Sequence, residues 1–333
     1  MEYRLVGRTG VQVSSLCMGT VTFGREANEE TAAAMFHRCR EAGINFFDTA
    51  NNYAGGRAEE ILGQLTAGCR DEIVLTSKVG FPAGEDVNAS GLSRRHIMSS
   101  VETSLRRLRT DRLDLYFMHR FDPHTPVEEP LRALDDLVHQ GKILYPAVSN
   151  WAAWQIATAL GISAREGLAR FACIQPMYNL VKRQAEVEIL PLAQAEHLGV
   201  ISFSPLGAGL LTGKYSPTRR PERGRLIDDT LQRKRYENPA YFQIAERFAA
   251  HAKERGVHPA TLAVAWVMAH PAITAPIMGA RNVAQLEALL AAADVPMTPE
   301  WRAEISALSL EPPPATDRSE ERSGVFYRGG RTK

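Results

Sequence analysis

Four residues that could handle a proton follow three successive apolar segments of the sequence. Asp48 directly follows one segment, Tyr53 lies five residues further along, and Lys78 and His119 end the next two. A free phenol has a pKa of about 10, but a neighbouring ammonium favours the phenolate and lowers that pKa. A carboxylate would keep a buried lysine charged. The set predicts general acid catalysis, in which Tyr53 protonates an oxygen that becomes an alkoxide and His119 orients the carbonyl.

Each of these residues also has an ordinary structural explanation. A lysine at a strand end can extend its ammonium into solvent, and an aspartate before a threonine often caps a helix. The occurrence of all four at successive strand ends favours the catalytic interpretation. A metal centre of His119, Asp122 and His124 is not expected, because their spacing is typical of a loop and no second cluster accompanies them.

The segments that carry these residues belong to an alternation of short apolar runs and longer amphipathic stretches. Most runs are too short for helices and several are rich in β-branched or aromatic residues, which indicates buried parallel strands. The eight runs are 16–18, 44–47, 73–76, 113–118, 143–148, 172–174, 200–203 and 273–277. Helical patterns lie between them, among them 29–42, 58–65, 94–108, 127–139 and 185–197.

Eight strands that alternate with helices predict an α/β fold, a (β/α)8 TIM barrel, in place of two domains. The carboxyl ends of all eight strands meet on one face of such a barrel, so the four residues would share one rim. The alternative is a doubly wound sheet, which needs a glycine-rich phosphate turn after its first strand. The segment 19–24 does not have the GxGxxG spacing of that turn.

Several segments add to the predicted barrel. Residues 3–13 alternate about a glycine-containing turn and predict an N-terminal β-hairpin. Residues 207–237 form a long loop after strand seven that is rich in arginine, and it is either a binding segment or a solvated surface. Residues 240–256 are expected to form an extra helix towards the C-terminus. We expect one domain over 1–310 and a polar C-terminal tail over 311–333.

Composition and charge argue against several other classes of protein. Of 333 residues, 39 are Lys or Arg and 38 are Asp or Glu, a balance not typical of nucleic-acid-binding proteins. The N-terminus lacks an apolar signal core, and no run approaches the roughly 18 apolar residues of a membrane span. The 4 cysteines lie far apart, as expected of reduced thiols. We expect a cytoplasmic protein without membrane or nucleic-acid partners, and the sequence leaves its oligomeric state open.

Several short motifs occur together between about Tyr3 and about Leu290. They are LVGRTG at 5–10, GT and FG within 19–24, FDTA and a tyrosine within 47–53, SK at 77–78, SLRRL at 104–108, LY and a histidine within 115–119, GK at 141–142, VSN at 148–150, Gln175, SPL at 204–206 and GAR at 279–281. Together they make the sequence similar to the aldo-keto reductase superfamily, which are NADPH-dependent carbonyl reductases on a (β/α)8 barrel. The resemblance implies Tyr53 as the general acid, Asp48 and Lys78 as its tuning pair, and His119 as the carbonyl-orienting donor.

The resemblance also implies NADPH as the cofactor, bound without a Rossmann fold. It implies that Ser149, Asn150 and Gln175 hydrogen-bond the nicotinamide amide, and that Phe203 stacks on the nicotinamide. The remaining positions implied in cofactor binding are Gly19, Thr20 and Asp48 near the reacting end, Ser204, Pro205, Leu206, Gly209, Leu211 and Lys214 around the pyrophosphate, and Gly279, Arg281 and Gln285 at the adenosine 2′-phosphate and ribose. A guanidinium such as that of Arg281 suits a phosphate, although it would also be ordinary as a solvated cation at a helix start.

Two positions depart from the pattern of that family. Many relatives have a carboxylate or amide that meets the adenine where this sequence has Ala288 and Leu289, and Glu287 is the nearby substitute. Ala147 stands where a glycine usually precedes the Val-Ser-Asn run, which we interpret as a change in packing.

Aromatic residues of the predicted rim loops would line a pocket for an apolar or aromatic substrate, or else pack these loops together. They are Phe23, Phe81, Phe121 and Trp151, to which Tyr53 and His119 are added as substrate contacts. Trp154 and Trp266 lie within helical patterns and are expected in the core. Three functions stay open: reduction of an aldehyde or ketone, reduction of a keto-sugar or sugar nucleotide, and an NADPH-binding regulatory subunit with little turnover, as in potassium-channel β subunits.

Overall fold

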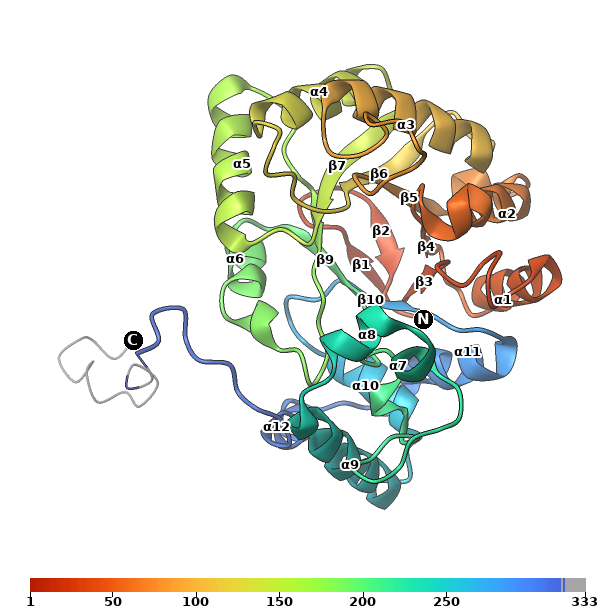
Figure 1. The fold of residues 1–333 in the computed structure, drawn as a ribbon, viewed down its shortest axis with the longest axis vertical. Coiled ribbons are helices and arrows are strands. Elements are labelled where there is room, and N and C mark those ends of the chain that lie inside the picture. The colour runs from red at the N-terminus through yellow and green to blue at the C-terminus, as the bar shows by residue number, and fades with distance from the viewer. Residues whose placement is uncertain (319, 321–333) are drawn as a thin grey trace.

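The eight apolar runs form a closed barrel of parallel strands in the computed structural model, which describes residues 1–318 and 320 (Figure 1). Neighbours around the barrel follow the order β10-β3-β4-β5-β6-β7-β8-β9. The strands are β3 (Cys17–Gly19), β4 (Phe46–Asp48), β5 (Val74–Val79), β6 (Leu113–Met118), β7 (Ile143–Ser149), β8 (Cys173–Gln175), β9 (Gly199–Ser202) and β10 (Ala275–Met278). The predicted (β/α)8 TIM barrel is therefore confirmed.

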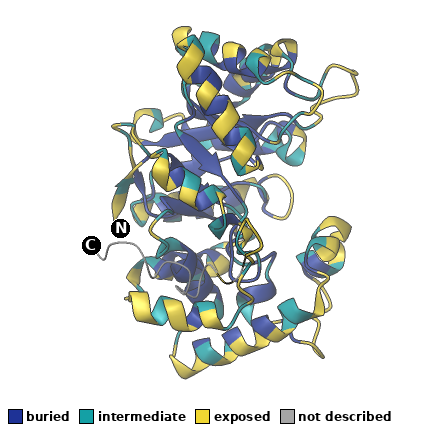
Figure 2. Ribbon diagram, turned by 90° about the vertical axis from the view of Figure 1, so that its left-hand side faces the viewer, coloured by how far each residue is buried: buried dark blue, intermediate teal, exposed yellow. Residues whose placement is uncertain are grey.

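Amphipathic segments form the helices around this barrel, and their buried faces pack on the outward side chains of the strands. On the third helix, Ile97, Val101 and Leu105 follow one another at intervals of one turn and are all buried. Figure 2 shows the buried strands at the centre and exposed outer faces on the helices. The helices are α1 (Glu29–Glu41), α2 (Arg57–Thr66), α3 (Arg94–Leu108), α4 (Glu128–His139), α5 (Ala153–Glu166), α6 (Ile189–Ala195), α7 (Arg225–Asp228), α8 (Thr230–Arg235), α9 (Pro239–Glu254), α10 (Pro259–Met268), α11 (Val283–Leu290) and α12 (Pro299–Ala307).

Two expectations about helical segments are wrong. The stretch 185–197 is not one helix, because α6 begins only at Ile189, after a separate 3-10 turn. Pro191 lies in the first turn of α6, where its ring would clash with the carbonyl of a helical residue four positions earlier. Trp154 is not in the core: it lies on the outer side of α5 and is 66% exposed, whereas Trp266 is fully buried as expected.

The N-terminal hairpin closes one end of the barrel. β1 (Tyr3–Leu5) pairs antiparallel with β2 (Gln12–Ser14), as the alternation predicts. Val6 and Val13 are buried with the side chains that fill the barrel interior. Gly7 has φ +56°, and a Cβ there would lie 2.7 Å from the backbone nitrogen of Gly199. The turn therefore needs glycine because the hairpin lies directly against the barrel.

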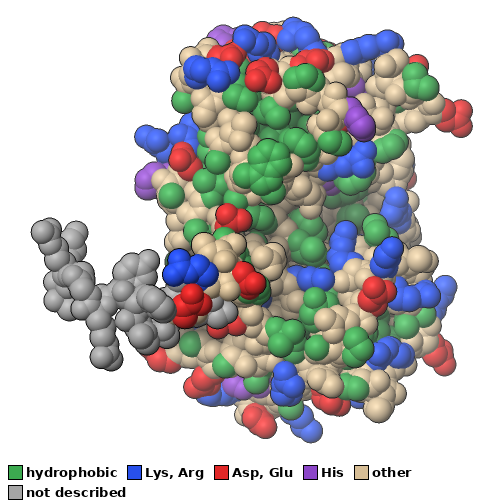
Figure 3. All heavy atoms as spheres, turned by 60° about the vertical axis from the view of Figure 1, so that its left-hand side comes forward, with side chains coloured by type: hydrophobic (Ala, Val, Ile, Leu, Met, Phe, Trp, Pro, Cys, Tyr) green, Lys and Arg blue, Asp and Glu red, His purple; other side chains and the backbone are tan. Residues whose placement is uncertain are grey.

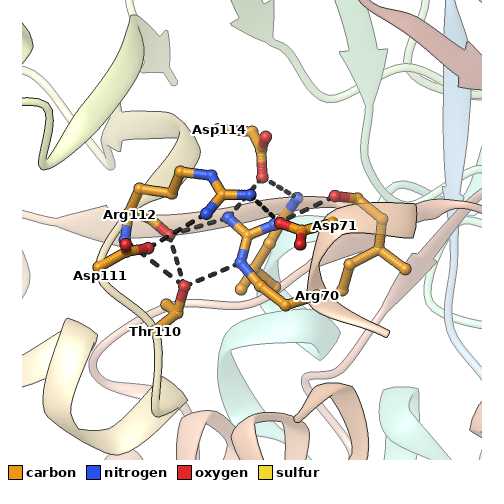
Figure 4. Close-up of polar contacts among 8 residues, drawn as sticks. Arg70, Asp71, Thr110, Asp111, Arg112 and Asp114 are labelled. Atoms are coloured by element: carbon orange, nitrogen blue, oxygen red, sulfur yellow. Dashed lines mark hydrogen bonds and ion pairs between the residues drawn. The ribbon is translucent and has the colours of Figure 1, made fainter. Parts of the chain in front are cut away.

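A polar network joins two neighbouring strands at this same end of the barrel (Figure 4). The carboxylate of Asp114 accepts hydrogen bonds from the backbone N–H of Leu75 and from Arg70. Arg70 also donates to Thr110 and to the carbonyl oxygens of Ile73 and Arg112. Because these contacts lie at the amino ends of β5 and β6, they stabilise the fold on the face opposite the predicted rim.

The segment 207–237 contains short helices in addition to loops. It includes α7 and α8, drawn in teal in Figure 1, and is followed by α9, which covers the predicted extra helix. Within the described residues, no helix combines the length and apolar character that crossing a membrane requires. Of the expected tail 311–333, residues 319 and 321–333 lie outside the described part of the chain.

Candidate active site

The alternation of side chains along the strands brings the predicted site residues to one rim. The residues that fill the barrel interior include Phe46, Phe117 and Ala147. In a strand, every second residue faces the same side, so the position two residues further along also faces inward. Those positions include Asp48, His119 and Ser149, and the same step leads from Cys173 to Gln175 and from Ile201 to Phe203.

Lys78 and Asp48 form a buried ion pair at the centre of this rim. The side chain of Lys78 is 0% exposed and that of Asp48 is 3% exposed. The ammonium lies 2.8 Å and 2.6 Å from the two carboxylate oxygens and 2.7 Å from the carbonyl oxygen of Thr49. Thr76 and Gln175 also donate to Oδ1 of Asp48. Burial alone would lower the pKa of Lys78, but the charge and hydrogen bonds of Asp48 raise it above its ordinary value.

Tyr53 reaches this pair from the short helical turn that follows β4. Its hydroxyl lies 3.5 Å from the ammonium nitrogen of Lys78. Burial raises the pKa of Tyr53, and the charge of Lys78 lowers it only in part. The predicted influence of Lys78 is therefore present, but the net direction differs from the prediction because removing a phenolate from water costs more than the one cation returns.

His119 lies beside Tyr53 at the end of β6. The centroids of the two rings are 6.0 Å apart, and Phe81 contacts the imidazole edge-on at 4.6 Å. Burial and the nearby positive charges of Lys78 and Arg120 hold the pKa of His119 well below its ordinary value. The imidazole is consequently neutral at physiological pH and can donate one hydrogen bond without carrying charge.

The residues expected at the nicotinamide amide form a connected group at the ends of β7 and β8. The amide nitrogen of Asn150 donates to Ser149 Oγ and to the carbonyl oxygen of His119, at 2.9 Å each. Ser149 Oγ in turn donates to the carbonyl oxygen of Gln175. Asn150 has φ +59°, a conformation that non-glycine residues rarely adopt. Such strain is typical of functional sites that the surrounding structure holds in place.

The opposite side of this group is formed by the ends of β3 and β9. Thr20 donates from both its backbone N–H and its hydroxyl to the carbonyl oxygen of Asp48. Gly19 precedes it, and a Cβ there would lie 2.5 Å from Ile277. Phe203 is partly buried and packs on the side chains of the barrel interior. These residues border the same rim as the Lys78–Asp48 pair.

Positive charge gathers where a phosphate is expected. A Cβ at Gly209 would lie 3.4 Å from the ammonium nitrogen of Lys214, so glycine keeps the space beside that cation open. Burial and the like charge of Arg281 lower the pKa of Lys214. Arg281 has a distant acidic contact, 3.9 Å from Glu26. This cluster suits a multiply charged anion.

Several other residues expected around the phosphates have structural roles in the backbone or in the core. Ser204 has φ +59°, and Leu206 accepts a hydrogen bond from the backbone N–H of Leu211, whose side chain is fully buried in the core. Pro205 is buried, and Gly279 is exposed at the end of β10. Gln285, in the first turn of α11, accepts a hydrogen bond from the backbone N–H of Arg281, which lies just before that helix.

The expected adenine region contains few free polar groups. Leu289 is buried and Ala288 is partly buried, so both pack towards the core. Glu287 binds Arg38 through two hydrogen bonds, at 2.5 Å and 3.1 Å. Its carboxylate already has a cationic partner on α1. Ala147 lies fully buried in the barrel interior, in line with a packing change.

The rim aromatics fall into two groups. Phe23 is fully buried in the core between barrel and helices, in line with the alternative that it packs the loops together. Phe81 contacts His119 at the rim. Phe121 packs edge-on against Trp151, which is buried and supports it. Figure 3 shows hydrophobic side chains around a hollow, with Lys and Arg side chains along one side of it.

Arg225 is one of the arginines of the segment 207–237, and no sequence pattern distinguishes it from the others. It begins α7, and its charge favours the Tyr53 phenolate, although this is the smallest of several effects on a pKa that burial raises overall. The residue before it, Gly224, lies close to Lys214 and Tyr215. The start of α7, within the arginine-rich segment 207–237, therefore lies beside Lys214 in the expected phosphate region. The composition of this segment pointed to it, but only the folded chain distinguishes Arg225 from its neighbours.

The loop that follows β6 is organised by Asp122. Its carboxylate accepts hydrogen bonds from the backbone N–H groups of Leu92 and His124 and from the hydroxyl of Thr125. Among the residues that the structure describes, no cluster of three His, Cys, Asp or Glu side chains is arranged to hold a metal ion. Asp122 thus acts as a loop-capping residue.

The closed (β/α)8 barrel places Asp48, Lys78 and His119 at the carboxyl ends of its strands, which is where barrel enzymes have their active sites. The chain belongs to the aldo/keto reductase family, whose model matches residues 15–309. It is 37% identical to a probable voltage-gated potassium channel subunit beta of Oryza sativa subsp. japonica, over 95% of this chain and 99% of that protein. An uncharacterized oxidoreductase of Bacillus subtilis is also 37% identical, over 90% and 93% of the two chains. A putative aryl-alcohol dehydrogenase of Schizosaccharomyces pombe is 32% identical, over 90% and 93%.

Proposed function

We propose that the protein reduces an aldehyde or ketone to the alcohol with NADPH as its cofactor. The observation that carries this proposal is the Tyr53 hydroxyl, 3.5 Å from an ammonium that Asp48 holds charged, beside a neutral imidazole. A phenol in this position can give up a proton, and the adjacent cation stabilises the phenolate that results. Membership of the aldo/keto reductase family supports the same reaction.

The residues present fit the proposed cofactor. The open space at Gly209 beside Lys214, and the positive charge that Lys214 and Arg281 carry, suit a phosphate-rich ligand. Ser149, Asn150 and Gln175 would hold the nicotinamide amide, and Arg281 would favour NADPH over NADH. When bound, NADPH supplies the hydride that reduces the carbonyl carbon.

The side chains of the rim divide the remaining work. His119 orients the carbonyl oxygen by donating a hydrogen bond. Its buried Nδ1 has no hydrogen-bond partner among the described residues, so the proton belongs on Nε2, where it can meet the substrate. Tyr53 donates its proton to the same oxygen, and Lys78 stabilises the phenolate. Phe81 and Phe121 would contact an apolar or aromatic group of the substrate.

The test compares NADPH consumption by the wild type and by Tyr53→Phe with an activated aryl aldehyde, methylglyoxal, glyceraldehyde and a keto-sugar. We expect Tyr53→Phe to lower kcat by about 10²–10⁴-fold while NADPH binding, followed by fluorescence, is unchanged. Tyr3→Phe is the matched control, because Tyr3 lies on the N-terminal hairpin at the opposite end of the barrel, where its hydroxyl donates to the carbonyl oxygen of Gly43. Equal activity of Tyr53→Phe and wild type would contradict the assigned role.

A second candidate is an NADPH-binding regulatory subunit with little turnover. It is favoured by the relatives named as potassium-channel β subunits, such as that of Oryza sativa. The same assay separates the two functions. Tight NADPH binding without turnover on any of the four carbonyls would favour the regulatory subunit, whereas turnover that depends on Tyr53 favours the reductase.

A further inference from the structure

An arginine on α3 holds the loop that carries Tyr53, although it does not reach the rim itself. Nη1 of Arg107 lies 3.1 Å from the carbonyl oxygen of Asn51 and 3.1 Å from Oε2 of Glu59. This nitrogen carries two hydrogens and can donate one to each acceptor. Asn51 lies two residues before Tyr53, so the guanidinium hydrogen-bonds the backbone close to the residue that carries the phenol.

The other acceptor is a fully buried carboxylate behind the barrel wall. Glu59 on α2 is 0% exposed, and its second oxygen accepts a hydrogen bond from Ser77 at 2.6 Å. Ser77 precedes Lys78 on β5. One chain of contacts therefore runs from the strand that carries Lys78, through Glu59 and Arg107, to the loop that carries Tyr53.

The loop needs such a support because three successive residues hold a left-handed backbone, which is strained at Ala54. Ala54, Gly55 and Gly56 have φ values of +49°, +65° and +99° in succession. A Cβ at Gly56 would lie 2.2 Å from Cζ of Arg107, so the guanidinium lies directly against the backbone there. A non-glycine residue such as Ala54 adopts this conformation at a cost that surrounding contacts must offset.

We propose that Arg107 is a positioning residue that sets the distance between the Tyr53 hydroxyl and the Lys78 ammonium. This inference rests on the proposed reductase function and deepens it. If the contact to Asn51 is lost, the strained loop relaxes and the phenol no longer lies at a defined distance from the cation and the carbonyl oxygen. A displacement of about 1 Å is enough to lower a rate by about 10²-fold.

The experiment must separate positioning from the neutralisation of Glu59. Arg107→Met leaves a buried carboxylate without its cation, which destabilises the fold by itself. The double variant Arg107→Met/Glu59→Leu removes both charges and leaves no group that can donate to Asn51. Replacing a buried ion pair by apolar residues of similar size is often tolerated, so we expect the double variant to recover most of the thermal stability.

Two measurements are made on both variants. In hydrogen exchange followed by mass spectrometry, we expect the amides of residues 49–56 to exchange about tenfold faster than in the wild type, with β6 unchanged. With the best carbonyl substrate, we expect kcat to fall by about 10²-fold and the affinity for NADPH to stay the same. Arg106→Met is the matched control, because Arg106 is exposed on the same helix. Among the described residues, its guanidinium hydrogen-bonds only the hydroxyl of Thr103.

Two results would overturn the proposal. Wild-type exchange in residues 49–56 of the double variant would show that Arg107 does not hold the loop. Recovery of wild-type kcat in the double variant would show that Arg107 serves only to neutralise Glu59. If the wild type itself has no turnover, the proposed reductase function fails, but the exchange experiment still decides whether Arg107 positions the loop.

Discussion

The substitution Asp48→Asn tests the buried ion pair through the geometry of its two oxygens. Oδ1 accepts hydrogen bonds from Thr76, Lys78 and Gln175 at 2.8, 2.8 and 2.9 Å. Because three donors face this oxygen, the amide oxygen of the variant must take its place. The NH2 group then replaces Oδ2, 2.6 Å from the ammonium of Lys78, and sets a donor against a donor.

The cost of this substitution follows from the burial of Lys78. The side chain of Lys78 is 0% exposed, so its ammonium cannot be hydrated once the carboxylate is gone. Removing one partner of a buried pair costs about 3–5 kcal/mol of the free energy of unfolding. We expect a loss in this range at about pH 7, together with a lower kcat, because Lys78 no longer stabilises the Tyr53 phenolate as well.

The loss should depend on pH in a defined direction. In the wild type the pKa of Lys78 is raised above 10.5, so its stabilising contribution is present below the pKa of the unfolded chain and is lost only as the pH rises through the folded pKa. In the variant, burial acts without the carboxylate and lowers the pKa of Lys78. The unfolded variant then binds more protons than the folded one at alkaline pH, and its stability rises with pH. The difference in the free energy of unfolding between the wild type and Asp48→Asn should therefore narrow by up to about 1.4 kcal/mol per pH unit.

Urea unfolding of both proteins at about pH 7 and about pH 9.5 measures this gap, because groups that titrate alike in both proteins cancel. Asp136→Asn is the control: Asp136 pairs with Arg94 on the surface and is 42% exposed, so about 1 kcal/mol or less should be lost at either pH. A gap below about 1 kcal/mol for Asp48→Asn, or one that stays constant with pH, would refute the reasoning.

Three further predictions concern the fold and the cofactor. Arg70→Met removes four hydrogen bonds from the amino end of the barrel and should lower the free energy of unfolding by about 3–5 kcal/mol in urea titrations while kcat stays unchanged. A lower kcat would show that Arg70 affects the site at the opposite end of the barrel. Gly63→Ala should cost about 2–3 kcal/mol in the same titration, because its Cβ would lie 2.6 Å from backbone atoms of Leu108, and an unchanged midpoint would contradict this close packing of α2 on α3. Arg281→Gln should weaken NADPH binding by about 10-fold or more and leave NADH binding nearly unchanged in fluorescence titrations. An equal effect on both cofactors would show that Arg281 does not bind the 2′-phosphate.

Local periodicity was enough to predict most of the elements. The run 113–118 and the helix 94–108 have the same bounds in the structure, because an apolar run interrupted only by Asp114 favours a strand and an apolar stripe at intervals of one turn favours a helix. Where a prediction is wrong, the apolar pattern alone did not decide. Pro191 delays α6, and Trp154, which was expected in the core, lies exposed on α5.

The sequence by itself determined the barrel and the rim positions of Asp48, Lys78 and His119. The alternation of side chains within a strand and the succession of strands and helices along the chain can both be recognised in the sequence. Only the tertiary structure decided how these groups behave. The pKa of Tyr53 is raised because burial outweighs the effect of Lys78, and the charge of Arg225, 172 positions further along the chain, also acts on the phenol. Such effects are sums over contacts between distant residues, and no pattern along the chain contains those sums.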